Sequence, residues 1–167
     1  MNSFKANDGL DVTFIVENQE VKATQYILRS TSRVFQAMFD GEWKEAESDR
    51  IEIVGFSLKA MTVFIGMLHG VDYDIENDVS LGLELISLAD KYEVKECVGW
   101  FAYQVSQKVA IDNVISILEL GQQLNLFDLK KSASLFIQTR PVGKIDELPG
   151  YKSVSHDAKD LIVKALY

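Results

Sequence analysis

The chain has 167 residues, of which 47% are hydrophobic and 25% charged, the size and balance of one globular domain or of one domain with a helical appendage. Its net charge of −8 disfavours nucleic acid as a partner, since phosphate binding needs clustered Lys and Arg, and no stretch approaches the roughly 18 apolar residues of a membrane span. One cysteine, Cys97, excludes an internal disulfide, and the first residues lack a signal-peptide pattern, so we expect a soluble protein of the cytoplasm or the nucleus without a membrane partner.

Residues 11–23 predict a β-hairpin. The segment DVTFIVE alternates Val12, Phe14 and Val16 on one face, as a half-buried strand does. The dipeptide NQ that follows is polar and indicates the reversal, and EVKA continues as a short second strand.

The pattern then changes to helical spacing. In YILRSTSRVFQAMF the apolar residues recur three and four positions apart, and Ser32 is placed to cap a second helix. RIEIV predicts a short third strand with Ile51 and Ile53 facing inward. The next helix is expected to begin after Ser57 as its N-cap and to end at Gly70.

The remainder of the chain predicts mostly helices. An acidic loop, VDYDIENDV, leads into SLGLELISLADKY, EVKECVGWFAYQVSQKV, DNVISILELGQQL and FDLKKSASLFIQTR, and DAKDLIVKALY predicts a last short helix. LISLADKYEVKEC aligns weakly with ILELGQQLNLFDL, which pairs Ala89 with Gly121 and Tyr92 with Leu124. We interpret the two segments as stacked helical hairpins in which a small residue lets the second helix approach. An accidental match of two amphipathic hairpins explains the alignment equally well.

Residues for catalysis are nearly absent. The histidines are His69 and His156, and no nucleophile elbow, phosphate-binding glycine loop or paired metal-ligand motif occurs, so we expect no enzyme, no cofactor and no metal. Cys97 is predicted to be a small buried hydrophobe, since Val94 and Phe101 flank it at helical spacing. His69 precedes a helix-ending Gly and is interpreted as a cation at the helix C-terminus. Chemistry through Cys97 or the histidines remains a minor alternative.

The segment FDGEWKEAESDRIEI places Trp43 among acidic side chains. A large indole ringed by charges is typical of an interface anchor, because it supplies apolar area at low entropic cost. The alternative is that Trp43 folds back onto Phe39 as a lid on the helix end, and the two roles are compatible.

Several of these motifs together resemble the BTB/POZ domain. They are DVTF, ATQYILRSTSRVFQAMF, RIEI and LADKY, in the order typical of that family and spanning residues 11–105. The resemblance implies an α+β fold in which a small three-stranded sheet flanks a helical cluster. The later helices resemble the 3-box or BACK-like extension of the MATH-BTB group of speckle-type POZ proteins. We therefore expect a lead at 1–10, a BTB/POZ domain at 11–107 and a helical extension at 108–167.

Many BTB proteins with this extension are Cullin-3 adaptors for ubiquitin ligases, and the resemblance implies that role here. Their loop after the Met-Phe helix carries an apolar residue, any residue and Glu, which match Trp43, Lys44 and Glu45, with Glu42 beside them. A groove beside the helices at 112–140 is expected to take a further cullin segment. The alternative is a homodimeric scaffold that binds no cullin, with Ile27 at the position of a family dimer contact.

The chain also departs from the family pattern. Where the family usually has His-Lys or His-Arg, the helix after the hairpin opens with Thr24-Gln25, so Asp11 lacks the basic partner used in corepressor binding. Only ten mostly polar residues precede Asp11, without the N-terminal helix that completes many BTB dimers. No MATH, Kelch or zinc-finger pattern is recognised. We expect either that the chain is a fragment of a longer adaptor or that it binds the ubiquitination substrate through a surface that the sequence does not identify.

Overall fold

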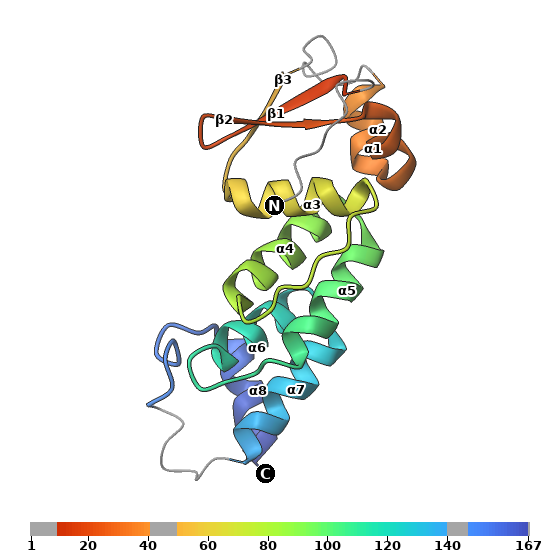
Figure 1. The fold of residues 1–167 in the computed structure, drawn as a ribbon. Coiled ribbons are helices and arrows are strands. Elements are labelled where there is room, and N and C mark those ends of the chain that lie inside the picture. The colour runs from red at the N-terminus through yellow and green to blue at the C-terminus, as the bar shows by residue number, and fades with distance from the viewer. Residues whose placement is uncertain (1–9, 41–49, 140–146, 167) are drawn as a thin grey trace. The chain divides into compact units, whose positions relative to one another are not determined.

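The structure is a computed structural model that describes residues 10–40, 50–139 and 147–166. Its contacts divide the chain into two compact units, one of residues 1–73 and 84–98, the other of 74–83 and 99–167. The described residues form a three-stranded sheet and eight helices, in agreement with the expected α+β fold, and Figure 1 labels these elements. Two of the helices, α4 (Val79–Lys91) and α5 (Lys95–Ser106), contribute residues to both units.

The sheet of the first unit has the strand order β2-β1-β3, with β1 (Val12–Val16) antiparallel to β2 (Gln19–Ala23) and parallel to β3 (Arg50–Ile53). The predicted hairpin and third strand are confirmed, with Ile51 and Ile53 buried. The reversal lies one residue earlier than predicted, at Glu17 and Asn18. Both have positive φ, 50° and 63°, as a two-residue hairpin turn that matches the strand twist requires.

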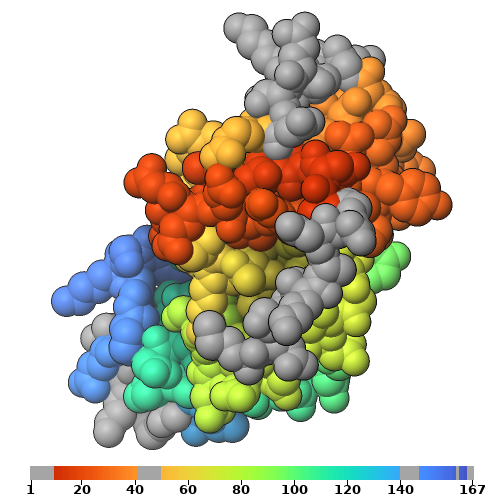
Figure 2. Space-filling view, turned by 45° about the horizontal axis from the view of Figure 1, so that its top comes forward, coloured from red at the N-terminus to blue at the C-terminus, as the bar shows by residue number. Residues whose placement is uncertain are grey.

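Two short helices follow the hairpin, α1 (Gln25–Thr31) and α2 (Arg33–Phe39), and Figure 2 shows them (orange) beside the strands (red). Ser32 separates them in an extended conformation. Its hydroxyl accepts from the Phe35 N–H at 3.1 Å and donates to the Tyr92 carbonyl at 2.6 Å. The predicted cap is thus confirmed, and the same hydroxyl ties α2 to the end of α4.

Aromatic rings form the centre of the first unit. Tyr92 of the LADKY motif stacks on Phe35 with ring centroids 4.3 Å apart, and Phe14 and Phe64 lie 5.7 and 5.9 Å from Phe35 and Tyr92 respectively. All four side chains are buried, which raises the pKa of Tyr92 to about 12. Motif residues far apart in the sequence therefore meet in one core.

Helix α3 (Leu58–Leu68) packs against β2. Ser57 accepts from the Ala60 N–H as predicted, and its own hydroxyl and N–H both donate to the Glu84 carboxylate. The apolar residues Met61, Phe64 and Ile65, which lie on one face of the helix, are buried, and Leu68 is half-buried. Gly70 follows the helix with a φ of 82°, a conformation that favours glycine.

The second unit contains α6 (Val114–Gln123), α7 (Phe127–Gln138) and α8 (His156–Leu166), which pack on one another around Leu118, Ala133 and Ile162. Asn125, with a φ of 54°, joins α6 to α7, and the N–H of the following residue, Leu126, donates to the Gly121 carbonyl at 2.8 Å. The corner between α4 and α5 has the same construction. This agreement favours the hairpin interpretation of the sequence alignment over an accidental match.

Candidate protein-interaction surface

The residues predicted to bind a cullin, Glu42, Trp43, Lys44 and Glu45, lie outside the residues that the structure describes. The structure describes the two elements between which they lie in the sequence, α2 and β3. The candidate surface is therefore built from described residues of the first unit.

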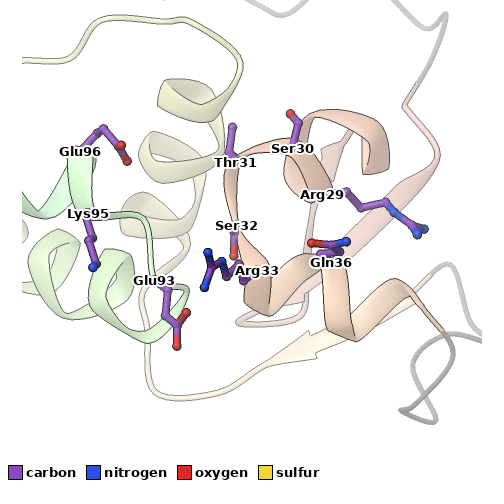
Figure 3. A pocket seen from close by; sticks show the side chains of 9 residues that line it. All are labelled: Arg29, Ser30, Thr31, Ser32, Arg33, Gln36, Glu93, Lys95 and Glu96. Carbon is purple, nitrogen blue, oxygen red and sulfur yellow. The ribbon is translucent and has the colours of Figure 1, made fainter.

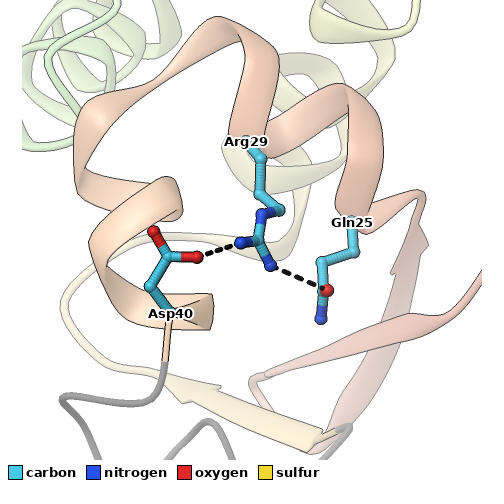
Figure 4. A network of polar contacts seen from close by, with 3 residues as sticks. All are labelled: Gln25, Arg29 and Asp40. Atoms are coloured by element: carbon cyan, nitrogen blue, oxygen red, sulfur yellow. Dashed lines mark hydrogen bonds and ion pairs between the residues drawn. The ribbon is translucent and has the colours of Figure 1, made fainter.

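A polar network holds the end of α2, as Figure 4 shows. The Arg29 guanidinium donates to the carboxylate of Asp40, the C-cap of α2, and to the Gln25 amide oxygen at 3.5 Å. Arg29 and Asp40 are both partly exposed, so the pair contributes less than about 1 kcal/mol to stability. The pair joins α1 to the C-cap of α2.

Next to α2 lies a pocket of about 500 Å³, here called the polar pocket, lined by residues 29–33, Gln36, Glu93, Lys95 and Glu96 (Figure 3). Four exposed charged side chains face it, two of each sign: Arg33, Glu93, Lys95 and Glu96. Within the described parts of the chain none of the four makes a hydrogen bond or ion pair. Unpaired charges of both signs can be met by a protein partner with complementary charges.

In the second unit, α5 and α7 border a depression of about 270 Å³, here called the α5–α7 groove. Tyr103 and Leu135 line it and are 57% and 52% exposed. Phe127, 70% exposed, lies four residues before Lys131, whose ammonium group is 5.8 Å from the ring centroid. Exposed apolar side chains that border a depression are typical of a binding surface.

Helix α1 presents three different environments in consecutive residues. Tyr26 is 78% exposed, Ile27 is half-buried and Leu28 is fully buried. Ile27, the predicted dimer contact, therefore has apolar surface left accessible. Asp11, which lacks the family's basic partner, accepts from the Gln25 N–H at 2.6 Å. Since the N-cap Thr24 makes no side-chain cap bond, Asp11 supplies that bond to α1.

Cys97 is buried, as predicted, and burial together with the neighbouring Glu96 carboxylate raises the pKa of its thiol to about 11. The interpretation of His69 as a cation is wrong. Its Nδ1 donates to the Ile65 carbonyl at 2.8 Å and its Nε2 accepts from the Thr24 N–H at 3.1 Å, which only the neutral ring can do. His156 is exposed and lies 3.6 Å from Asp160.

The described ranges contain no cluster of three His, Cys, Asp or Glu side chains arranged to hold a metal ion. No helix in those ranges has the length and apolar character needed to cross a bilayer.

Residues 1–99 match the family described as BTB, BTB/POZ domain. The chain belongs to the BTB/POZ family. This family is typically a protein-interaction module, and its membership confirms the predicted fold class.

The BTB/POZ chain is also similar to longer proteins. It is 27% identical over 127 residues to "ARM repeat protein interacting with ABF2" of Arabidopsis thaliana, an alignment that covers 76% of this chain and 18% of the relative. It is 24% identical over 131 residues to Kelch-like protein 26 of Danio rerio, with 76% and 21% covered. The BTB domain of human gigaxonin aligns with a TM-score of 0.46 and 14% identity over 58% of this chain and 78% of that one. The chain thus spans about a fifth of the length of these curated relatives.

The sequence did not single out the charged lining of the polar pocket or Tyr103 of the α5–α7 groove. Arg33, Lys95 and Glu93 look like ordinary solvated charges in the sequence. The helix-corner-helix pattern of the alignment could have indicated the pocket. Residues at the corner of a helical hairpin lie on the surface, beside the elements that pack on the first helix.

Proposed function

We propose that this chain acts as a Cullin-3 adaptor, a protein-interaction module that performs no chemistry of its own. The observation that carries the proposal is the polar pocket beside α2, in which Arg33, Glu93, Lys95 and Glu96 have no partner among the described residues. Such a surface, in a family typically devoted to protein interactions, is suited to a protein partner with charges of both signs.

The proposed contacts divide into an anchor and a polar surround. Trp43 inserts into an apolar pocket of the cullin, Glu45 pairs with a polar or basic group beside it, and Glu42 and Lys44 flank them. Burial of the indole contributes about 2 to 4 kcal/mol to binding. The polar pocket would add charge pairs that set orientation and association rate more than affinity.

A second contact is proposed in the α5–α7 groove. Tyr103, Phe127 and Leu135 offer apolar surface to an extended cullin segment. We identify the α5–α7 groove with the groove predicted beside the helices at 112–140. The ubiquitination substrate binds through a region that the described residues do not identify, and the complex works in the cytoplasm or nucleus.

Calorimetric titration with the Cullin-3 N-terminal domain tests the proposal. We expect binding by the unmodified chain, its loss in Trp43→Ala and its weakening in Glu45→Ala, with melting temperatures unchanged. Absence of binding by the unmodified chain contradicts the proposal. A large fall in melting temperature with binding retained would assign Trp43 to the core instead.

A charge reversal tests the polar pocket separately. Arg33→Glu with Lys95→Glu changes the net charge by −4, and Lys22→Glu with Lys152→Glu, at exposed positions outside the pocket, changes it by the same amount. We expect the first pair to weaken binding at least tenfold and the control pair to have little effect. Equal effects would mean that overall charge, and not the pocket, governs binding.

The second candidate is a homodimeric scaffold that binds no cullin. It is favoured by the exposed Tyr26 and the half-buried Ile27 on adjacent positions of α1. Light scattering would show a stable dimer that Ile27→Asp converts to a monomer, and the cullin titration would show no heat. A dimer that also binds the cullin would combine the two functions.

A further inference from the structure

The sequence Arg29-Ser30-Thr31-Ser32-Arg33 at the junction of α1 and α2 places three hydroxyl groups between two arginines, on the wall of the polar pocket. The three differ in availability. The Ser32 hydroxyl is buried and makes two hydrogen bonds, to Phe35 and Tyr92. Ser30 and Thr31 are exposed, and their hydroxyls donate only to carbonyls of their own helix turn, 2.8 to 3.1 Å away.

The same pocket is also lined by two cations, Arg33 and Lys95. Figure 3 shows Arg33 extending from α2 toward the α4–α5 corner, which carries Lys95. Neither side chain makes a hydrogen bond or ion pair within the described residues, whereas Arg29 is held by Asp40. Two exposed hydroxyls and two available cations thus line one pocket of about 500 Å³.

We propose that Ser30 and Thr31 form a phosphorylation site whose phosphate pairs with Arg33 and Lys95. A protein kinase with an acidic substrate groove would read the flanking arginines. The hydroxyl oxygen forms a bond to the γ-phosphorus of ATP, the bond from that phosphorus to the β–γ bridging oxygen breaks, the hydroxyl proton passes to the kinase base, and ADP leaves. Because these residues form the last turn of a seven-residue helix, opening that turn exposes both hydroxyls.

The phosphate would change the charge of the pocket. It carries about −1.5 to −2 charges at neutral pH. Glu93 and Glu96 face the same pocket and oppose it, so Arg33 and Lys95 are the groups that hold it there. With both cations occupied, the remaining cation of the pocket wall is Arg29, which is already paired with Asp40. Resting on the proposed function, we infer that phosphorylation weakens cullin binding at least tenfold.

The site is tested without any cullin. The folded chain and a peptide of residues 24–38 are treated with a serine/threonine kinase directed to basic residues and with ATP, and the products are mapped by mass spectrometry. We expect phosphate on Ser30 or Thr31 of both and none on Ser32 of the folded chain. Phosphate elsewhere in the folded chain, or an unmodified chain beside a modified peptide, overturns the proposal, as does a peptide that the kinase ignores.

Pairing is tested by phosphorus NMR. The second ionisation of the bound phosphate should lie below its usual pKa of about 6 and return toward it in Arg33→Gln with Lys95→Gln. Identical titration curves overturn the pairing. Calorimetry then compares the phosphorylated and unmodified chains with the cullin domain. Equal affinity overturns the regulatory role, whereas failure of the unmodified chain to bind counts against the adaptor function and leaves the modification site standing.

Discussion

The α4–α5 corner and the α6–α7 corner share one backbone construction in different surroundings. In the first, Glu93 has a φ of 54° and the next N–H donates to the Ala89 carbonyl at 2.9 Å. In the second, Asn125 has a φ of 54° and the next N–H donates to the Gly121 carbonyl at 2.8 Å. These bonds satisfy carbonyls at the end of each first helix, which a helix end otherwise leaves unpaired.

The two corners differ in burial. Leu88, Tyr92 and Val94 of the first are buried, whereas the aligned Leu120, Leu124 and Leu126 of the second are half-buried. The construction of the corner is therefore independent of core burial. Local hydrogen bonds and a left-handed residue suffice to form it, and the surroundings decide how much each side chain stabilises the fold.

Replacing the aligned Tyr92 and Leu124 by alanine tests this difference most strongly. Tyr92→Ala removes a ring stacked 4.3 Å from Phe35 and leaves a cavity, so we expect a loss of about 3 to 5 kcal/mol of unfolding free energy. Leu124→Ala removes a half-buried side chain and should cost about 1 to 2 kcal/mol. Urea denaturation followed by circular dichroism measures both. Equal losses would contradict the difference in burial.

The small residues of the two corners are predicted not to be interchangeable. A Cβ at Gly121 would lie 2.9 Å from the Leu129 Cβ and 3.1 Å from the Lys130 nitrogen, and the backbone atom cannot move aside cheaply. For Gly121→Ala we expect a net loss of about 2 kcal/mol, because overpacking of up to about 3 kcal/mol exceeds the roughly 1 kcal/mol that alanine gains over glycine in a helix. Thermal and urea unfolding measure it.

Ala89→Gly is the matched control, at the aligned position. It should cost about 1 to 2 kcal/mol, from the lower helix propensity of glycine and from the loss of a buried methyl group. A stabilised Gly121→Ala variant would show that close approach of α7 to α6 is not required.

The sequence predicted the hairpin, the three strands and the Ser32 and Ser57 caps because each depends on local patterns of period two or on one hydroxyl before a helix. It also aligned Ala89 with Gly121 and, in the same register, Glu93 with Asn125. It did not predict that these two residues are left-handed, since glutamate carries no signal for that conformation and asparagine only a weak one. The His69 tautomer was missed because Thr24, its second partner, is 45 residues away. The polar pocket was missed for the same reason, since residues 29–33 and 93–96 meet only in the folded chain.

The left-handed residues at the corners should respond differently to glycine. Glu93 accepts a conformation that is strained for most side chains, whereas asparagine tolerates it. We expect Glu93→Gly to stabilise the folded chain by about 0.5 kcal/mol, once the added conformational entropy of the unfolded chain is subtracted. Asn125→Gly should be neutral or slightly destabilising, because Asn125 also accepts a hydrogen bond from the Lys130 ammonium at 2.6 Å. Differential scanning calorimetry on both variants decides the order. A destabilised Glu93→Gly would indicate that the Glu93 side chain contributes a contact of its own.

The smallest effect is expected where Cys97 of the first corner aligns with Leu129 of the second, both of them buried. Burial and Glu96 raise the pKa of the thiol from its ordinary 9.0 to about 11, so little thiolate exists at pH 8 and a disulfide reagent should react only through unfolding or local opening.

The unfolded chain ionises the Cys97 thiol at lower pH than the folded chain does. Its contribution to stability is therefore complete below about pH 9 and is lost as the pH rises toward 11. Labelling rates measured against pH and urea check both statements, with Cys97→Leu as the control that removes the labelling. Rapid labelling of the native chain at pH 8 would mean that the helix face carrying Cys97 opens far more readily than the core to which it belongs.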